Sequence, residues 1–141
     1  MYLSKKTILI LAALIMITAA GVYAASSDDV TRMSVMELKT MIDNGTAVVI
    51  VDNRPKGDFD RQRIKGAVSL PWAMDVAAAA KKVLPSDKLI VTYCACGPGE
   101  SDSADVAAQL LSAGFANVKT LKDGWEAWEA AGYPAEKGKM K

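Results

Sequence analysis

The chain has 141 residues and a formal net charge of +1, from 17 basic and 16 acidic side chains, which suits one ordinary domain. It has no basic patch interleaved with aromatic residues, so we expect no nucleic-acid partner. Histidine is absent, which excludes Ser-His-Asp and Cys-His catalysis and histidine-ligated metal sites. Any nucleophile must therefore be activated by backbone dipoles or by lysine or arginine.

The N-terminus has the three parts of a secretory signal peptide. Residues 1–6 carry positive charge, residues 7–21 form an apolar run of 15 residues, and Val22-Tyr23-Ala24 fits the small-x-small rule for cleavage. We therefore expect residues 1–24 to be removed and the protein to be exported, to a periplasm or to the outside of the cell. The alternative is an uncleaved membrane anchor, although the apolar run is a little short for a spanning helix.

The rest of the chain is expected to hold one domain at residues 33–136. Polar residues 25–32 are expected to be a linker, and residues 137–141 a disordered tail. Strand patterns alternate with helix patterns along the domain. This alternation predicts a small α/β fold in which helices cover both faces of a central parallel sheet.

The first helix is expected from Ser34 to about Asp43, because Ser34 and Glu37 match a capping box. The apolar run at residues 47–52 is typical of a buried strand and ends at Asp52. Arg54 follows two residues later. We therefore favour a structural ion pair between Asp52 and Arg54 over a catalytic role for the carboxylate.

Later elements follow the same alternation. They are expected at residues 57–62 (a helical turn), 64–71 (strand), 72–84 (helix), 88–93 (strand), 104–113 (helix), 116–121 (strand) and 125–131 (helix). The expected inner face of the 72–84 helix consists of Met74, Val76, Ala77, Ala80 and Val83. Trp125 and Trp128 are three residues apart, which places both on one helical face and favours core anchors over a ligand cage.

Cys94 is the candidate nucleophile, because it lies where a buried strand ends and a Gly97-Pro98-Gly99 loop begins. Ligands of open α/β sheets bind beyond the carboxyl ends of strands. The helix after the loop would direct its free N–H groups and positive dipole end at the loop. Such surroundings lower the pKa of a thiol and favour the thiolate. The competing interpretation is that Cys94 is a small buried hydrophobic residue.

Several short motifs stand in a characteristic order along the chain. They are Val49-Ile50-Val51-Asp52-Asn53-Arg54, Ile64-Lys65-Gly66-Ala67 before Leu70-Pro71, Val91-Thr92-Tyr93-Cys94, Ser103-Ala104, Ala113-Gly114-Phe115, Leu121-Lys122-Asp123-Gly124-Trp125-Glu126-Ala127-Trp128 and Ala131-Gly132-Tyr133-Pro134. Each motif is weak by itself, but together, in this order, they resemble the rhodanese-like (sulfurtransferase) family. The resemblance covers Ser34 to about Pro134.

The resemblance implies that Cys94 takes a sulfane sulfur from a donor such as thiosulfate, carries it as a persulfide and passes it to a thiol or cyanide. It assigns to the active-site loop Ala95, Cys96, Gly97, Pro98, Gly99, Glu100, Ser101, Asp102 and Ser103. Asp52 and Arg54 match the family's Asp-x-Arg, which helps to support the loop. Neither a cofactor nor a metal is expected, and a protein partner is left open.

The loop also departs from the usual family pattern. It is longer, and it contains Glu100 and Asp102 but no lysine or arginine, so a dianionic donor is poorly matched electrostatically. The mismatch motivates an alternative function, a catalytically silent rhodanese-fold module that binds a partner protein or a sulfur species. A subset of the family with Cys-x-Cys, a proline and a glutamate in this loop is more similar.

Cys96 raises further alternatives. With Cys94 it could close a disulfide in an oxidising compartment, resolve a persulfide, or act as a dithiol redox pair. It could also be an incidental loop residue, because spacing alone does not decide connectivity. A Cys-x-Cys site for a soft ion such as copper(I) is weakly supported by two ligands.

Overall fold

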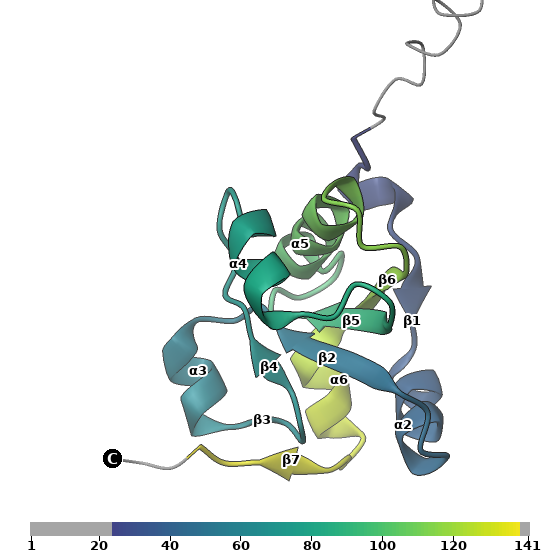
Figure 1. Ribbon diagram of the computed structural model, residues 1–141. Coiled ribbons are helices and arrows are strands. Elements are labelled where there is room, and N and C mark those ends of the chain that lie inside the picture. Colours follow the sequence, from purple (N-terminus) through teal and green to yellow (C-terminus); the bar gives the residue numbers. More distant parts are fainter. Residues whose placement is uncertain (1–23, 139–141) are drawn as a thin grey trace, which may run out of the picture.

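The computed structural model describes residues 24–138. Its strands are β1 (Arg32–Met33), β2 (Val48–Asp52), β3 (Arg63–Ile64), β4 (Val68–Ser69), β5 (Leu89–Tyr93), β6 (Val118–Leu121) and β7 (Ala135–Glu136). Its helices are the 3₁₀ helix η2 (Ser27–Asp29), α2 (Val35–Asp43), α3 (Lys56–Arg61), α4 (Ala77–Val83), α5 (Ser101–Ser112) and α6 (Gly124–Ala130). The alternation of strands and helices confirms the predicted α/β class (Figure 1).

The central sheet has five strands in the order β1-β6-β5-β2-β4, and every neighbouring pair is parallel. β2 and β5 pair along their whole length, ending with Asp52 opposite Tyr93. Because parallel strands share one carboxyl edge, Asp52 and the residue after Tyr93, which is Cys94, come to the same edge of the sheet. A separate antiparallel pair joins β3 to β7.

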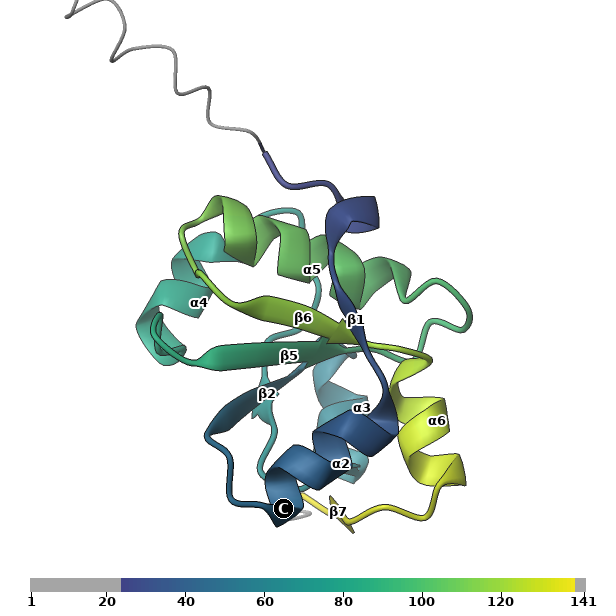
Figure 2. The same ribbon diagram turned by 90° about the vertical axis from the view of Figure 1, so that its right-hand side faces the viewer.

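Helices cover both faces of the sheet, as predicted. Figure 2 shows α4 and α5 on one side of β5 and β6, and α2 and α6 on the other. Side chains alternate accordingly along β5: Ile90 belongs to the core cluster with Leu110 of α5, and Tyr93 to the cluster with Trp125 and Trp128 of α6. Both tryptophans are buried, which confirms their prediction as core anchors.

Helix α2 begins and ends where the sequence predicts. Ser34 is its N-cap, and its hydroxyl accepts a hydrogen bond from the backbone N–H of Glu37 at 3.2 Å. The Glu37 carboxylate accepts a bond from the Ser34 N–H at 2.8 Å, which completes the capping box. The bond from the Ser34 backbone N–H, and a second one that the Ser34 hydroxyl donates to the same carboxylate at 2.7 Å, lower the pKa of Glu37. Asn44 is the C-cap.

The expected linker at residues 25–32 belongs to the domain instead. Val30 is only 2% exposed and packs in the core cluster beneath α5. Arg32 begins β1, which pairs with β6 opposite Thr120 and so adds an edge strand to the sheet. The polar composition concealed this arrangement, because one buried valine and a two-residue strand leave no hydrophobic period in the sequence.

The stretch expected as one strand at residues 64–71 consists of two strands in different sheets. β3 ends at Ile64, and Gly66 has a φ of +82°, a conformation that favours glycine. β4 then starts at Val68. The turn at Gly66 separates the apolar residues that the sequence pattern joined.

The helix expected at residues 72–84 begins only at Ala77. The Trp72 N–H bonds the Asn53 carbonyl at 3.0 Å, and the Val76 N–H bonds the side chain of Gln109 at 2.9 Å. These long-range bonds replace the helical ones. Of the expected inner face, Val76, Ala77 and Ala80 are buried or half-buried, whereas Met74 is 90% and Val83 55% exposed.

The ends of the chain fall largely outside the described residues. The expected signal peptide lies there except for Ala24, which is exposed. Of the expected tail, Gly138 lies against α3, where its N–H bonds the Asp60 carbonyl at 2.9 Å. None of the helices within residues 24–138 combines the length and apolar character that a membrane span requires.

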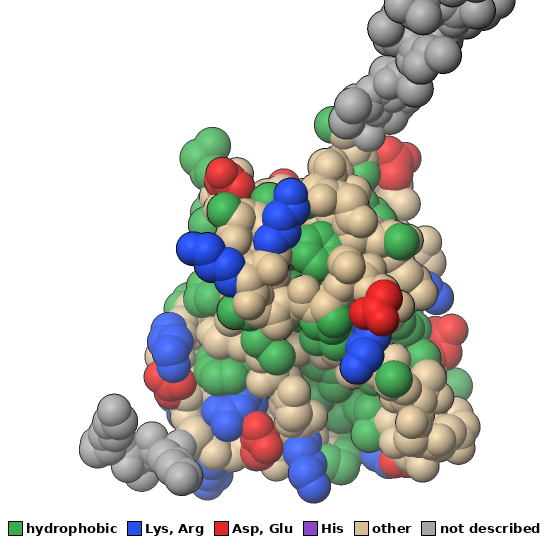
Figure 3. Space-filling model, viewed as in Figure 1, with side chains coloured by type: hydrophobic (Ala, Val, Ile, Leu, Met, Phe, Trp, Pro, Cys, Tyr) green, Lys and Arg blue, Asp and Glu red, His purple; other side chains and the backbone are tan. Residues whose placement is uncertain are grey.

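On the face shown in Figure 3, basic side chains are interspersed with acidic ones.

Candidate active site

Cys94 follows β5 directly and is 2% exposed. Its backbone carbonyl accepts a hydrogen bond from the Trp125 N–H at 2.9 Å, which fixes the end of the strand against the start of α6. Gly124 allows this contact. A Cβ at Gly124 would collide with the Cys94 carbonyl oxygen, and its φ of +51° also favours glycine. The turn before α6 therefore positions the candidate nucleophile.

Cys94 and Cys96 are joined by a disulfide, which the sequence left open. Their Cα atoms lie 5.6 Å apart, within the usual range for a disulfide. Ala95 between them is exposed, and Cys96 is half-buried. In this oxidised form Cys94 is not a nucleophile, so the bond must be reduced before Cys94 can act as a thiolate.

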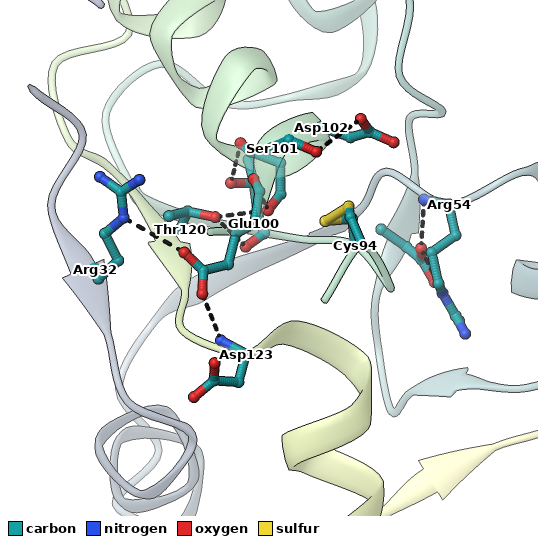
Figure 4. Close-up of a disulfide and its surroundings, with 12 residues drawn as sticks. Arg32, Arg54, Cys94, Glu100, Ser101, Asp102, Thr120 and Asp123 are labelled. Atoms are coloured by element: carbon teal, nitrogen blue, oxygen red, sulfur yellow. Dashed lines mark hydrogen bonds and ion pairs between the residues drawn. A yellow bond between two sulfur atoms is a disulfide. The ribbon is translucent and has the colours of Figure 1, made fainter. Parts of the chain in front are cut away.

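The loop after β5 runs from Cys94 to Glu100 and is shorter than predicted, because α5 already begins at Ser101. Ser101, Asp102 and Ser103, which were expected in the loop, form the first turn of α5. Figure 4 shows Ser101 and Asp102 at the start of α5, on the α5 side of the Cys94 sulfur. An early helix start brings the positive end of the helix dipole closer to the cysteine than the sequence indicated.

The loop offers backbone hydrogen-bond donors. Within residues 24–138, the N–H groups of Ala95, Cys96, Gly97 and Gly99 donate no hydrogen bond to another protein group. No side chain caps the first N–H groups of α5 either, although Glu100 occupies the N-cap position. Free N–H groups near a sulfur nucleophile stabilise negative charge on it or on a bound anion.

The Glu100 carboxylate does not face the cysteine. Glu100 is 4% exposed, and its side chain points towards Arg32 and Asp123 (Figure 4). One oxygen accepts a bond from the Asp123 N–H at 2.8 Å, and the other pairs with Arg32 Nε at 3.5 Å. From the sequence, Glu100 was predicted to be an acidic residue of the active-site loop. In the structure, its carboxylate attaches the loop to β1 and to the turn before α6.

Three buried hydroxyl groups, from Ser103, Thr92 and Thr120, hold the end of the loop and the start of α5 against the sheet. Ser103 Oγ lies 2.8 Å from Thr120 Oγ1 and 3.2 Å from the Glu100 carbonyl. Thr92 Oγ1 donates to the Ser103 carbonyl at 2.9 Å. Ser103, Thr92 and Thr120 are all completely buried. The start of α5 is therefore bonded to β5 and β6 through side chains as well as by packing.

Asp52 and Arg54 form the predicted ion pair beneath the same edge. Arg54 donates to both Asp52 oxygens, at 3.0 Å from Nε and 2.7 Å from Nη2. Its guanidinium lies over the Trp125 ring at 4.4 Å and points away from the Cys94 sulfur (Figure 4). Burial by itself would lower the pKa of Arg54, but its hydrogen bonds and charge interaction with Asp52 outweigh it and raise the pKa.

Tyr93 completes this buried network. Its hydroxyl donates to Asp52 and accepts a bond from the Ile64 N–H at 3.2 Å. Burial raises the pKa of Tyr93 far above its usual value, and the charge and hydrogen bond of Asp52 raise it further. Tyr93 and Arg54 therefore both keep their protons near neutral pH. It supports the strand that ends at Cys94.

A groove of about 310 Å³ adjoins the start of α5, lined by Asn53, Pro55, Pro71, Trp72 and Asp102. Asn53 is 2% exposed and donates to the Leu70 carbonyl at 2.7 Å. Its Oδ1 atom has no hydrogen-bond partner among the described residues. The groove thus combines an aromatic and two proline side chains with carbonyl and carboxylate acceptors.

Tertiary contacts add residues that the sequence reasoning missed. Arg32 was assigned to the linker, and Asp123, Gly124 and Thr120 had no assigned role at the site. Asp123-Gly124, in the motif at residues 121–128, was the available signal, because a positive-φ turn between a strand and a helix favours such residues. Arg32 left no signal. Within residues 24–138, no group of three or more Cys, Asp or Glu side chains is arranged to hold a metal ion.

This arrangement of strand, cysteine loop and helix matches a known domain type. Residues 34–131 match the model of the family described as "Rhodanese-like domain". The chain belongs to the rhodanese-like family. The match to the family model confirms the resemblance found in the motifs, and structures with the same fold agree with it.

Similar proteins come from several bacteria. The chain is 29% identical over 105 residues to the probable adenylyltransferase/sulfurtransferase MoeZ of Mycobacterium tuberculosis, covering 74% of this chain and 26% of MoeZ. The crystal structure of Alr3790 from Anabaena sp. is 30% identical, with a TM-score of 0.68, covering 77% of this chain and 94% of that one. The thiosulfate sulfurtransferase structure from Pseudomonas aeruginosa shares the fold at 24% identity and a TM-score of 0.63, covering 86% and 23%. The chain thus spans about a quarter of MoeZ.

Proposed function

We propose that this rhodanese-like protein is an exported sulfurtransferase that carries sulfane sulfur as a persulfide on Cys94. The observation that carries the proposal is the position of Cys94 at the carboxyl end of the central strand β5, at the start of a loop with free N–H donors. The sulfurtransferase relatives support the same chemistry. The chain has no histidine, and sulfur transfer to a thiolate requires none.

The transfer consists of two substitutions at sulfur. The Cys94 thiolate attacks the outer sulfur of a donor such as thiosulfate, the donor's S–S bond breaks, and sulfite leaves with the electron pair. An acceptor thiolate or cyanide then attacks the outer sulfur of the persulfide, and the Cys94 thiolate leaves. The N–H groups of residues 95–97 and 99 and the start of α5 would stabilise the anionic sulfur in both steps.

The position of Glu100 favours an anionic donor more than the sequence suggested. Because Glu100 is paired with Arg32 and bonded to the Asp123 N–H, its charge is directed away from Cys94. Asp102 is then the acidic residue of the original loop assignment that still lines a groove near the start of α5. The electrostatic argument for a catalytically silent binding module is correspondingly weaker.

Export is part of the proposal. The N-terminal pattern of charge, apolar run and small residues motivates it, and a disulfide between Cys94 and Cys96 is compatible with an oxidising compartment. Whenever the disulfide has formed there, a dithiol must reduce it before the enzyme can be loaded, because the thiolate is the form that attacks the donor.

The test follows sulfite release and intact mass after the reduced protein, freed of reductant, is mixed with thiosulfate. We expect the wild type and Cys96→Ser to release sulfite, and Cys94→Ser to release none. Cys96→Ser is the matched control, because it makes the same substitution two residues away in the same loop. If neither thiosulfate nor inorganic polysulfide loads sulfur onto Cys96→Ser, the proposed function is wrong.

The disulfide favours one second candidate function, a dithiol–disulfide oxidoreductase. That function would show as rapid exchange of the Cys94–Cys96 bond with a small dithiol. It would replace the sulfurtransferase proposal if Cys96→Ser accepts no sulfur from either donor.

A further inference from the structure

Cys96 has no role in the two-step transfer, yet the structure bonds it to the sulfur-carrying atom. The chain contains two cysteines, so Cys96 is the one thiol of the same molecule that can react with a persulfide on Cys94. Cys94 is 2% exposed, whereas Cys96 is half-buried and follows the exposed Ala95. A thiol from solution therefore has poorer access to Cys94 than Cys96 has.

We propose that Cys96 resolves the Cys94 persulfide, so that the domain also reduces sulfane sulfur to sulfide. The inference rests on the proposed function, because it needs a persulfide on Cys94. It gives the protein a second outcome for the bound sulfur, which is release as hydrosulfide instead of transfer to an acceptor.

The step balances without further reactants. The Cys96 thiolate attacks Cys94 Sγ, the inner sulfur of the persulfide, and a bond forms between the two Sγ atoms. The bond from Cys94 Sγ to the outer sulfur breaks, and the outer sulfur leaves with the electron pair and the persulfide proton as hydrosulfide. The outer sulfur is reduced by two electrons while the two cysteine sulfurs are oxidised to the disulfide. A dithiol reductant then restores both thiols.

The structure favours attack on the inner sulfur over attack on the outer one. The bond that inner attack forms, between Cys94 Sγ and Cys96 Sγ, is the bond the structure contains. Attack on the outer sulfur would instead move the persulfide to Cys96 and form no bond between the two Sγ atoms. The observed disulfide is therefore the expected product of the resolving step.

The loop is also held so that Cys96 stays near Cys94 after reduction. Cys94 is fixed at one end by the bond from the Trp125 N–H, and Glu100 is fixed at the other by Asp123 and Arg32. Five residues lie between these two attachment points. A thiol confined in this way has a high effective concentration at the neighbouring sulfur. A thiol from solution must reach the same sulfur by diffusion, so its attack is slower.

A single-turnover experiment on the full mature protein tests the inference. Reduced protein is freed of reductant and mixed with thiosulfate, or with inorganic polysulfide if thiosulfate does not load it. Sulfite, sulfide and intact mass are measured with thiosulfate, and intact mass alone with polysulfide, which itself contains sulfide. The variants are Cys96→Ser and Cys94→Ser.

We expect the wild type to lose the mass of two hydrogen atoms and, with thiosulfate, to release one sulfide for each sulfite. Cys96→Ser should keep the added sulfur atom, with sulfide release lowered at least about tenfold because no intramolecular thiol is present. A wild type that retains the added sulfur as stably as Cys96→Ser would overturn the inference but leave the proposed function intact. Retention on Cys96 of the wild type would also overturn it. Failure of Cys96→Ser to load from either donor would overturn both proposals.

Discussion

Two buried carboxylates lie at the carboxyl edge of the sheet, and they are held in different ways. Asp52 is fully buried and bonded to both Nε and Nη2 of Arg54, whose side chain is 7% exposed. Glu100 is similarly buried, but its cation, Arg32, is 32% exposed and reaches it at 3.5 Å. Asp52 takes its partner from two residues along the chain. Glu100 takes Arg32 from 68 residues away and the Asp123 N–H from 23 residues away.

The difference distinguishes the network that supports β5 from the attachments that hold the cysteine loop in place. The Asp52 network packs against β5 and has no exposed partner among residues 24–138, so it supports the strand that ends at Cys94. Glu100 ends the cysteine loop and depends on a two-residue edge strand and a turn. We therefore expect changes at Asp52 to lower global stability, and changes around Glu100 to affect the loop and sulfur loading as well.

Asp52→Asn should have the largest effect on stability. It leaves the buried Arg54 guanidinium without its counter-charge, which typically costs about 3–5 kcal/mol. Urea unfolding of the variant and the wild type measures the loss. Adding Arg54→Met should recover part of it. A double variant as unstable as the sum of the two single variants would show that the pair is not coupled.

Gly124→Ala should break the link between the cysteine strand and α6. A methyl group would collide with the Cys94 carbonyl oxygen and occupy a positive-φ position, so we expect a loss of roughly 2–4 kcal/mol. Gly45→Ala is the matched control, because Gly45 has a φ of +70° with open space around its Cβ position. Equal losses in the two variants would show that the contact with Cys94 contributes nothing beyond backbone conformation.

Glu100→Ala should destabilise the end of the cysteine loop, because it removes both attachments of the loop at once. We expect a stability loss of about 2–3 kcal/mol, and a smaller one for Glu100→Gln, which can still accept from the Asp123 N–H. Thiosulfate loading should slow in both variants. Asp102→Asn removes a neighbouring carboxylate without such attachments, and its stability should stay within about 0.5 kcal/mol of wild type. If Asp102→Asn is as destabilised as Glu100→Ala, loss of negative charge near the start of α5, rather than loss of the loop attachments, is responsible.

Tyr93→Phe should change how stability depends on alkaline pH. The pKa of Tyr93 is raised from 10.0, so the folded protein keeps its proton where the unfolded chain loses it. The wild type should therefore lose about 1.4 kcal/mol of stability per pH unit above pH 10 from this group. The variant lacks that loss, so the two unfolding free energies should converge between pH 10 and pH 11.5. Parallel curves over this interval would contradict the buried, protonated assignment of Tyr93.

The local part of the site could be predicted from the sequence. The end of β5 at Cys94, the Asp52–Arg54 pair, the α2 capping box and the buried Trp125 and Trp128 all depend on residues a few positions apart. Hydrophobic periodicity, capping patterns and short charge spacings record such contacts directly. The motif order added the family, which the comparison with the family model confirmed.

The contacts between distant segments of the chain could not be predicted from the sequence. Arg32 was assigned to a linker because an edge strand of two residues carries no periodic signal. Glu100 was counted as a free negative charge because nothing near it in the chain indicates a partner. The start of α5 at Ser101 was missed because polar Ser101-Asp102-Ser103 also suits a loop.

By itself, the sequence determined a parallel α/β domain with a cysteine at a strand end, because burial patterns and motif order are properties of the chain. The tertiary structure decided which charged groups face Cys94 and which residues contact it. It paired Glu100 with Arg32 and Asp123, aimed Arg54 away from the sulfur, and brought Cys96 onto Cys94. These outcomes depend on distances in space between segments far apart in sequence or on the bend of one loop, and neither is encoded in a local pattern.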